Sequence, residues 1–236
     1  MISARSYGIA AVPATPTIYL SGASRRRSPS ATAWEALILA DLSEFYREQG
    51  FLTEALELAT KAVEMAKEMA DAFSEATALV ALGGVDSATG NPDNAIECHL
   101  SAKGIAEAAG IRLPRSAAML GLAAAYLAKG EAASALSVTM EVLTLTRLAG
   151  YRLREGQALY LMAQSQSAGG DRESAWRNAR AALEIHRDTG YRLGCAKSLA
   201  LLAEIEDSQV PDISVFDRTP GVNPFGYAEL AKSGRI

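Results

Sequence analysis

The sequence predicts an all-α fold: an α-solenoid of about four 40-residue helix-turn-helix repeats that ends with a capping helix. Three observations predict it. The chain aligns with itself at a constant interval of forty residues, glycines recur at two places in each interval, and an alanine recurs at a third. Proteins with such a period bury the apolar face of each unit against the next unit. We therefore expect one domain with a continuous core along the stack.

The repeats follow one another without a gap. Four complete blocks and a partial fifth occupy residues 31–70, 71–110, 111–150, 151–190 and 191–208. The string GYRL occurs at two of the block junctions, forty residues apart. We interpret it as a turn glycine followed by the first residues of a helix. On this interpretation four side chains pack against the preceding turn: Tyr151, Leu153, Tyr191 and Leu193.

Glycines mark the two turns of each repeat. One column falls in the middle of the blocks and the other at their ends: Gly50, Gly90, Gly130 and Gly170, then Gly110, Gly150 and Gly190. Each glycine follows an apolar helical run, where helices commonly end with a residue in the left-handed conformation. Asn91, which precedes Pro92, and Asp171 are predicted to be the N-caps of the helices that follow.

The other columns predict the contacts between helices. In the second helix of each repeat a methyl-sized side chain permits close approach of the first helix: Ala55, Ala95, Ala135 and Ala175. Seven residues later, small side chains lie on the same face: Ala62, Ala102, Val142 and Ala182. In the first helix a large apolar column precedes a small one: Leu42, Leu82, Leu122 and Met162, then Ser43, Gly83, Ala123 and Ala163. A further column completes an apolar stripe that faces the core: Leu39, Leu79, Met119 and Leu159.

This combination of columns resembles the tetratricopeptide repeat. That family has a large apolar and then a small residue in the first helix, a near-fixed alanine in the second, and another small residue seven positions later. The resemblance covers residue 31 to about residue 207. The usual period is about 34 residues, so a period of 40 suggests that both helices are longer. HEAT-type repeats are the alternative at the level of the fold, and the alanine column favours the tetratricopeptide interpretation.

The segment HRDTGYRLGCAKSLALLAEI (186–205) is similar to the C-terminal repeats of large bacterial transcription activators. These are the antibiotic regulatory family and related LuxR-type regulators of actinobacteria. The resemblance implies a sensor or protein-interaction role in the regulation of transcription or of secondary metabolism. The sequence contains no helix-turn-helix DNA-binding segment and no Walker motif, so we expect no direct binding of nucleic acid.

The tetratricopeptide resemblance implies that first helices line a concave groove. The candidate groove residues are Glu44, Val80, Leu120, Leu127, Gln157, Tyr160, Gln164 and Lys197. The middle of this predicted groove is small and apolar, and its ends are polar and acidic. No ladder of Lys, Arg and Asn crosses it, unlike the carboxylate clamp by which some relatives hold chaperone tails. The alternative interpretation is that the small residues only let the helices pack tightly.

The predicted groove leaves several partners open. Its apolar floor suits a protein or peptide partner, bound as an amphipathic helix or as an extended apolar segment. The alternative is a small apolar ligand, bound as the effector of a sensor or as the substrate of an unusual biosynthetic enzyme. Homodimerisation through a poorly capped terminal repeat is the third interpretation. We predict no cofactor.

A catalytic constellation is not evident in the sequence, and we predict that the chain is not an enzyme. His99 follows Cys98 directly, so their side chains point in different directions on a helix and do not form a nucleophile pair. His186 is predicted to lie near a helix end, where a cation meets the carbonyl dipole favourably. Glu44 and Asp86 are a candidate carboxylate pair across the groove. No Cys/His spacing indicates a metal site.

Composition bounds the remaining possibilities. The chain has 236 residues, of which 49% are hydrophobic, and a formal charge of −4. Residues 1–30 carry +4 without an acid, so the rest carries −8. We expect residues 1–30 to be a flexible basic arm and residues 209–236 to be a tail that caps the last repeat or lies in the groove. Two cysteines and no long apolar run predict a cytoplasmic protein without a membrane span.

Overall fold

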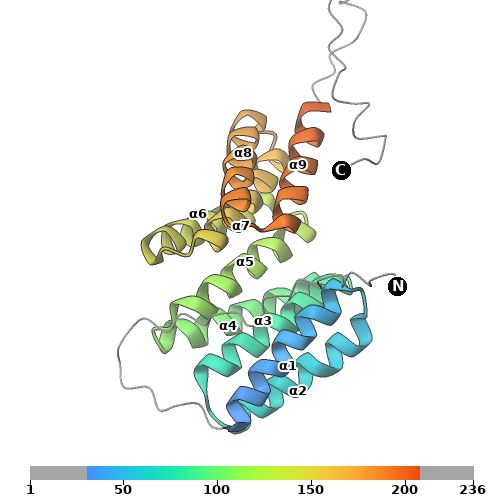
Figure 1. Ribbon diagram of the computed structural model, residues 1–236, viewed down its shortest axis with the longest axis vertical. Coiled ribbons are helices and arrows are strands. Elements are labelled where there is room, and N and C mark those ends of the chain that lie inside the picture. Colours follow the sequence, from blue (N-terminus) through green and yellow to red (C-terminus); the bar gives the residue numbers. More distant parts are fainter. Residues whose placement is uncertain (1–30, 208–236) are drawn as a thin grey trace, which may run out of the picture.

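The computed structural model describes residues 31–207, which form nine α-helices and no strand (Figure 1). Their bounds are α1 Ala31–Glu48, α2 Leu52–Glu68, α3 Ala72–Ala88, α4 Pro92–Ala108, α5 Arg112–Ala128, α6 Ala132–Ala149, α7 Arg152–Ala168, α8 Arg172–Asp188 and α9 Arg192–Asp207. The predicted all-α solenoid with a period of forty residues is confirmed. The predicted arm (1–30) and tail (209–236) lie outside the described residues, as does the last residue of the partial repeat.

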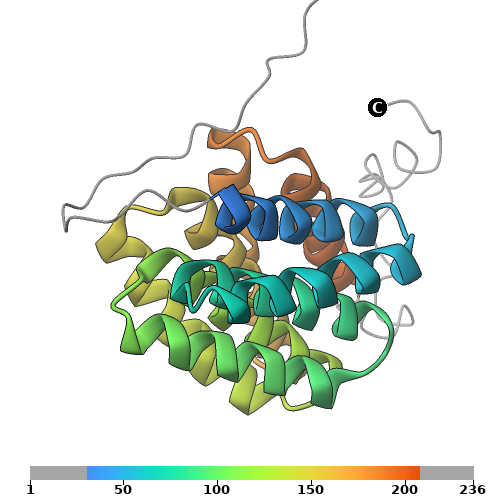
Figure 2. The ribbon, with the colours of Figure 1, turned by 90° about the horizontal axis from the view of Figure 1, so that it is seen from below.

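The helices form two layers. Each odd-numbered helix contacts the next helix in sequence and also the next odd-numbered helix, so α1, α3, α5, α7 and α9 form the inner layer. The even-numbered helices pack outside them. Figures 1 and 2 show that the pairs rotate along the stack, with α5 between the α1–α4 half and the α6–α9 half. As a result, one side of the inner layer is concave.

The turns adopt the conformation that the glycine columns predict. All seven column glycines have positive φ angles, from 67° to 84°. The amide of the following residue then donates to a carbonyl in the last turn of the helix, as Tyr151 does to Thr146 at 2.9 Å. Ala70 occupies the same place in the first repeat with a φ of 51°, where glycine would be less strained.

The predicted alanine column forms the contact between paired helices. Ala55, Ala95, Ala135 and Ala175 are all fully buried. At this contact the backbone of α2 comes close enough to α1 for the Ser43 hydroxyl to donate to the Ala55 carbonyl at 2.7 Å. The last apolar cluster includes Leu201 and Ile205 of α9 against Ala175 and Ala179 of α8, so α9 caps the stack.

One detail of the sequence prediction is wrong. Leu42, which the columns place in the core, is 41% exposed because α1 is the first helix of the described stack and no described repeat precedes it. Leu153 and Leu193, in the first turns of α7 and α9, are 42% and 45% exposed, and their packing against the preceding turn stays a prediction. Asn91 is the N-cap residue of α4 and Pro92 its first residue, as predicted, although the Asn91 side chain makes no capping bond and its amide donates to the Thr89 hydroxyl. Asp171 does cap α8 by accepting from the Ser174 amide.

Within residues 31–207, no helix is long and apolar enough to cross a membrane.

Candidate functional site

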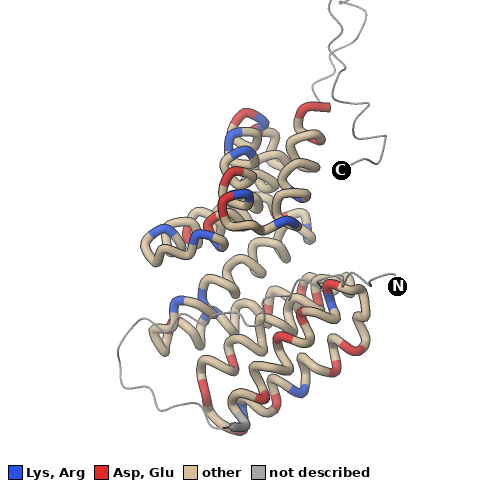
Figure 3. Tube along the Cα trace, viewed as in Figure 1, with Lys and Arg blue, Asp and Glu red and all other residues tan. Residues whose placement is uncertain are grey.

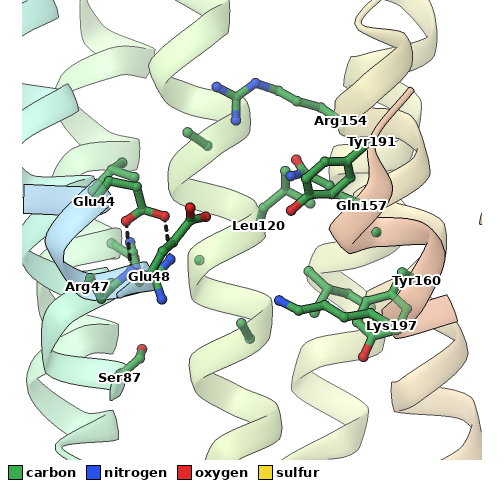
Figure 4. Close-up of a pocket in the computed structure, with 18 of the residues that line it drawn as sticks. Glu44, Arg47, Glu48, Ser87, Leu120, Arg154, Gln157, Tyr160, Tyr191 and Lys197 are labelled. Atoms are coloured by element: carbon green, nitrogen blue, oxygen red, sulfur yellow. Dashed lines mark hydrogen bonds and ion pairs between the residues drawn. The ribbon is translucent and has the colours of Figure 1, made fainter. Parts of the chain in front are cut away.

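The concave side of the inner layer holds a cavity of about 370 Å³ (Figure 4). The residues that line it come from every odd-numbered helix and from two even-numbered ones. They are Glu44, Arg47, Glu48, Val80, Gly84, Ser87, His99, Ala117, Leu120, Gly121, Ala124, Arg154, Gln157, Tyr160, Leu161, His186, Tyr191, Gly194 and Lys197. The rotation of the pairs therefore brings the first and the last described helices to the same space.

The α1 wall of the cavity is acidic. Acidic residues outnumber basic ones along α1 and α2 (Figure 3), and two of them, Glu44 and Glu48, reach the cavity. Glu44 accepts a hydrogen bond from the Arg47 Nε at 2.8 Å and forms an ion pair with the same guanidinium. This pair raises the pKa of Arg47. Glu48 lines the cavity and forms no ion pair with any described residue.

The opposite wall carries two cations. Arg154 lies in the first turn of α7 and Lys197 in α9, and Figure 4 shows both side chains extending into the space between the walls. Burial lowers the pKa of the Arg154 guanidinium, which nevertheless stays charged near neutral pH. The cavity thus has a negative wall and a positive wall.

Between the charged walls lies an apolar and aromatic surface. Leu120 of α5 is only 8% exposed and lies at the centre, with Ala117 and Ala124 on the same helix. Tyr160 and Tyr191 border it (Figure 4). Burial raises the pKa of both phenols, so both stay protonated and can donate hydrogen bonds. This surface can contact an apolar side chain while its rim binds polar groups.

The floor contains the buried imidazole of His99, from α4. Its ring is 1% exposed and lies between Gly83 of α3 and Gly121 of α5. A Cβ at Gly121 would lie 2.2 Å from the His99 Cε1, and one at Gly83 would lie 2.8 Å from it. Neither ring nitrogen has a hydrogen-bond partner among the described residues. Burial lowers the pKa of His99 to about 4, so the ring is neutral at physiological pH.

His186 occupies a similar notch between α7 and α9. Gly156 and Gly194 leave room for its ring, its Nδ1 lies 3.1 Å from the Ser198 hydroxyl, and Tyr191 contacts it edge-on with ring centroids 5.3 Å apart. The predicted role as a cation at a helix end is wrong, because burial lowers the pKa of His186 and favours the neutral ring. The ring instead supports Tyr191 at the edge of the cavity.

Six of the candidate groove residues line this cavity: Glu44, Val80, Leu120, Gln157, Tyr160 and Lys197. Leu127 and Gln164 do not. Leu127 lies at the far end of α5, and Gln164 lies beside Tyr160, to which its side chain is hydrogen-bonded. Their binding role stays a prediction.

Several lining residues were not among the sequence candidates. The first-helix columns did not include Arg154, which lies in the first turn of α7, or Tyr191, which precedes α9. His99 and His186 lie on second helices and reach the cavity because glycines stand opposite them. Glycine inside a predicted helix, as at Gly121 and Gly156, is the sequence signal that could have revealed these notches.

The predicted carboxylate pair does not form. Asp86 accepts from the Cys98 thiol at 3.7 Å, whereas Glu44 pairs with Arg47. Burial raises the pKa of Cys98 to about 11, which keeps the thiol protonated and unreactive. Cys98 therefore faces away from His99, as the sequence predicts. No group of three or more potential metal ligands occurs in the part of the chain that the structure describes.

Comparisons with known proteins agree on the fold. Residues 34–108 match the tetratricopeptide repeat family. No curated protein matches the chain. A protein of Podosopora anserina described as a kinesin light chain with nearly identical TPR-like repeats is similar, with 18% identity and a TM-score of 0.59 over 77% of this chain and 89% of that one.

Two regulatory proteins are also similar in structure. A Rap protein in complex with Competence and Sporulation Factor has 14% identity and a TM-score of 0.67 over 76% of this chain and 50% of that one. A signal transduction ATPase of Pyrococcus horikoshii with a tetratricopeptide repeat sensor has 15% identity and a TM-score of 0.60 over 79% and 29%. The chain thus corresponds to half of the first protein and to less than a third of the second. At these identities the likeness shows the fold alone.

Proposed function

We propose that this chain is an interaction module that binds a short peptide or protein segment in the cavity of its concave side. The observation that carries the proposal is the convergence of all five inner helices on one cavity with an apolar centre and oppositely charged walls. The similar Rap protein, whose complex contains Competence and Sporulation Factor, supports it. The sequence resemblance to transcription activators supports a regulatory role in the cytoplasm, exercised through binding and not through catalysis.

The cavity of about 370 Å³ lies on the concave side of the inner layer, where a short segment of the partner can enter between the two charged walls. A purely apolar ligand is the weaker candidate, because it offers no partner to the charges of Glu48, Arg154 and Lys197 that line the cavity.

Affinity selection with a pool of random pentapeptides with free ends tests this proposal. Peptides retained by the protein are identified by mass spectrometry, and their dissociation constants are measured by calorimetry. We expect Leu120→Glu to weaken binding at least tenfold, because it places a charge where the apolar side chain of the peptide would lie. Tyr160→Ala, at a partly exposed position, should weaken binding less and leave the fold intact.

The matched control is Met140→Glu, on the outer helix α6, where the side chain is 59% exposed. It should leave peptide affinity unchanged. Far-ultraviolet circular dichroism verifies that each variant is folded. Equal affinity of the folded Leu120→Glu and Tyr160→Ala variants and of the wild type would contradict binding in the cavity.

Self-association is a second proposed activity, favoured by an exposed apolar stripe on α1. Trp34, Ile38, Leu42 and Phe45 are between 41% and 57% exposed and lie three or four residues apart, hence on one face. We expect sedimentation velocity to show a dimer that dissociates on dilution, and we expect Ile38→Glu combined with Phe45→Glu to sediment as a monomer. A wild-type protein that is monomeric at every concentration would refute this role of the stripe.

A further inference from the structure

Arg154 lines the cavity at a place where a positive charge lowers the stability of the fold. It lies in the first turn of α7, where the helix dipole favours a negative charge and disfavours a cation. Burial lowers the pKa of its guanidinium because the charged form loses hydration. No acidic side chain within residues 31–207 forms an ion pair with it. The packing of the helices therefore gives no reason for an arginine here.

Arg152, in the same turn, shows what an arginine with a structural role looks like. Its side chain is 55% exposed, and its Nη1 lies 2.9 Å from the Glu155 Oε2. The other oxygen of that carboxylate accepts from the Arg147 Nε at 3.0 Å. Both of these arginines are thus paired at the surface with Glu155, whereas Arg154 forms no ion pair with this carboxylate. The guanidinium of Arg154 remains available to a group that enters the cavity.

The surrounding charges define which group this is. Lys197 of α9 extends into the same space as Arg154, whereas the unpaired Glu48 lies on the opposite wall (Figure 4). Glu44 is neutralised by Arg47. A group with one negative charge would be attracted by the two cations. In an unmodified peptide segment, the ligand of the proposed function, the anionic group is a carboxylate of the C-terminus or of an acidic side chain.

We propose that the cavity recognises a carboxylate of the bound segment, which Arg154 holds with help from Lys197, while a cationic group of the same segment faces Glu48. This inference rests on the proposed function and specifies the ligand. A guanidinium presents parallel N–H donors that match the two oxygens of a carboxylate, and such pairs are strong where water is excluded. The two walls would also fix the direction in which the segment lies.

The prediction of a groove without a Lys, Arg and Asn ladder does not conflict with this site. That prediction concerned the columns of first-helix positions that face the concave side. Arg154 lies outside those columns, at the start of its helix, and the rotation of the pairs brings it over the same space as Lys197. A single half-buried arginine, and not a row of cations, would hold the carboxylate.

The test uses the pentapeptides selected by the wild-type protein, resynthesised with a free or an amidated C-terminus and with acidic side chains kept or replaced by amides. Removing the carboxylate that is bound should weaken binding about ten- to a hundredfold. If amidation of the peptide C-terminus weakens binding, the bound carboxylate is that of the C-terminus. If Asp→Asn or Glu→Gln in the peptide weakens binding, it is that of a side chain. Either result supports the proposal.

The matched variants are Arg154→Met and Arg152→Met. Arg154→Met should weaken the binding of the carboxylate peptides by the same factor and leave the binding of their amide forms unchanged. It should also raise the melting temperature of the free protein, because an unpaired charge is removed. Arg152→Met should leave binding unchanged and should not raise the melting temperature. A role of Arg154 in the fold alone would lower the melting temperature and would affect both peptide forms equally.

The outcomes separate this inference from the proposed function. If amide forms bind as well as acids, and Arg154→Met has no effect while Leu120→Glu abolishes binding, the carboxylate site is overturned and the peptide-binding cavity stands. If no peptide is retained more by the wild type than by Leu120→Glu, both are overturned.

Discussion

Replacing Gly121 with alanine is expected to lower the free energy of unfolding by about 1–3 kcal/mol, the usual range for overpacking a core. The new Cβ would lie 2.2 Å from the His99 Cε1, well inside van der Waals contact. The ring is only 1% exposed and lies against Gly83 on its other side, so it can move away from the new Cβ only toward the cavity whose floor it forms. Urea denaturation followed by circular dichroism measures the change.

Gly104→Ala is the matched control for this substitution. Gly104 also lies inside a helix, α4, but no atom approaches within 4 Å of the Cβ that alanine would add. The substitution should therefore raise stability by about 0.5–1 kcal/mol, the difference in helix propensity. Adding His99→Ala to Gly121→Ala should recover part of the loss, because the clash disappears. A Gly121→Ala variant as stable as Gly104→Ala would show that the notch does not exist.

Acidification is expected to remove about 3 kcal/mol of stability through His99 alone. Burial lowers its pKa from 6.5 to about 4, so between these values the unfolded chain binds a proton that the folded chain does not. The free energy of unfolding should be constant above about pH 6.5, fall as pH falls through this window, and level off below pH 4. His186, whose pKa is also lowered, should add to the loss in the same direction.

Denaturation curves at several pH values for the wild type and for His99→Asn measure this effect. The difference between the two proteins isolates His99 from the carboxylates, which begin to titrate at the acidic end of the window. The wild type should lose stability more steeply than the variant between pH 6.5 and 4. Parallel pH dependences of the two proteins would mean that the ring is solvated or is paired in the folded state.

The fold was predictable from the sequence because its determinants are local and repeat. Each column glycine ends a helix through its own backbone conformation. Each column alanine is buried at the equivalent position of the second helix in its own repeat. The predicted burial of Leu42 was wrong because it depends on a preceding repeat, which α1 lacks within the described residues. A periodic pattern assigns the same environment to every repeat, so it is least reliable at the first and last ones.

The cavity was only partly predictable. Leu120 and Tyr160 were found because they occupy first-helix positions that face the concave side in any such stack. Tyr191 and Arg154 were missed because their position at the cavity depends on the rotation between successive helix pairs. The repeating columns of the sequence do not indicate the angle of this rotation. His99 was missed because a pair of glycines on two other helices, and not its own position, brings it to the floor of the cavity.

The central claim is that the first and last described helices share one binding cavity, and photo-crosslinking tests it most directly. A selected pentapeptide that carries benzoylphenylalanine is irradiated with the protein, and the attachment sites are mapped by mass spectrometry. The account predicts attachment to residues 44–48 of α1, to residues 154–161 of α7 and to residues 191–197 around the start of α9. Attachment confined to α2 and α6, the two helices that contribute no residue to the cavity, would contradict it.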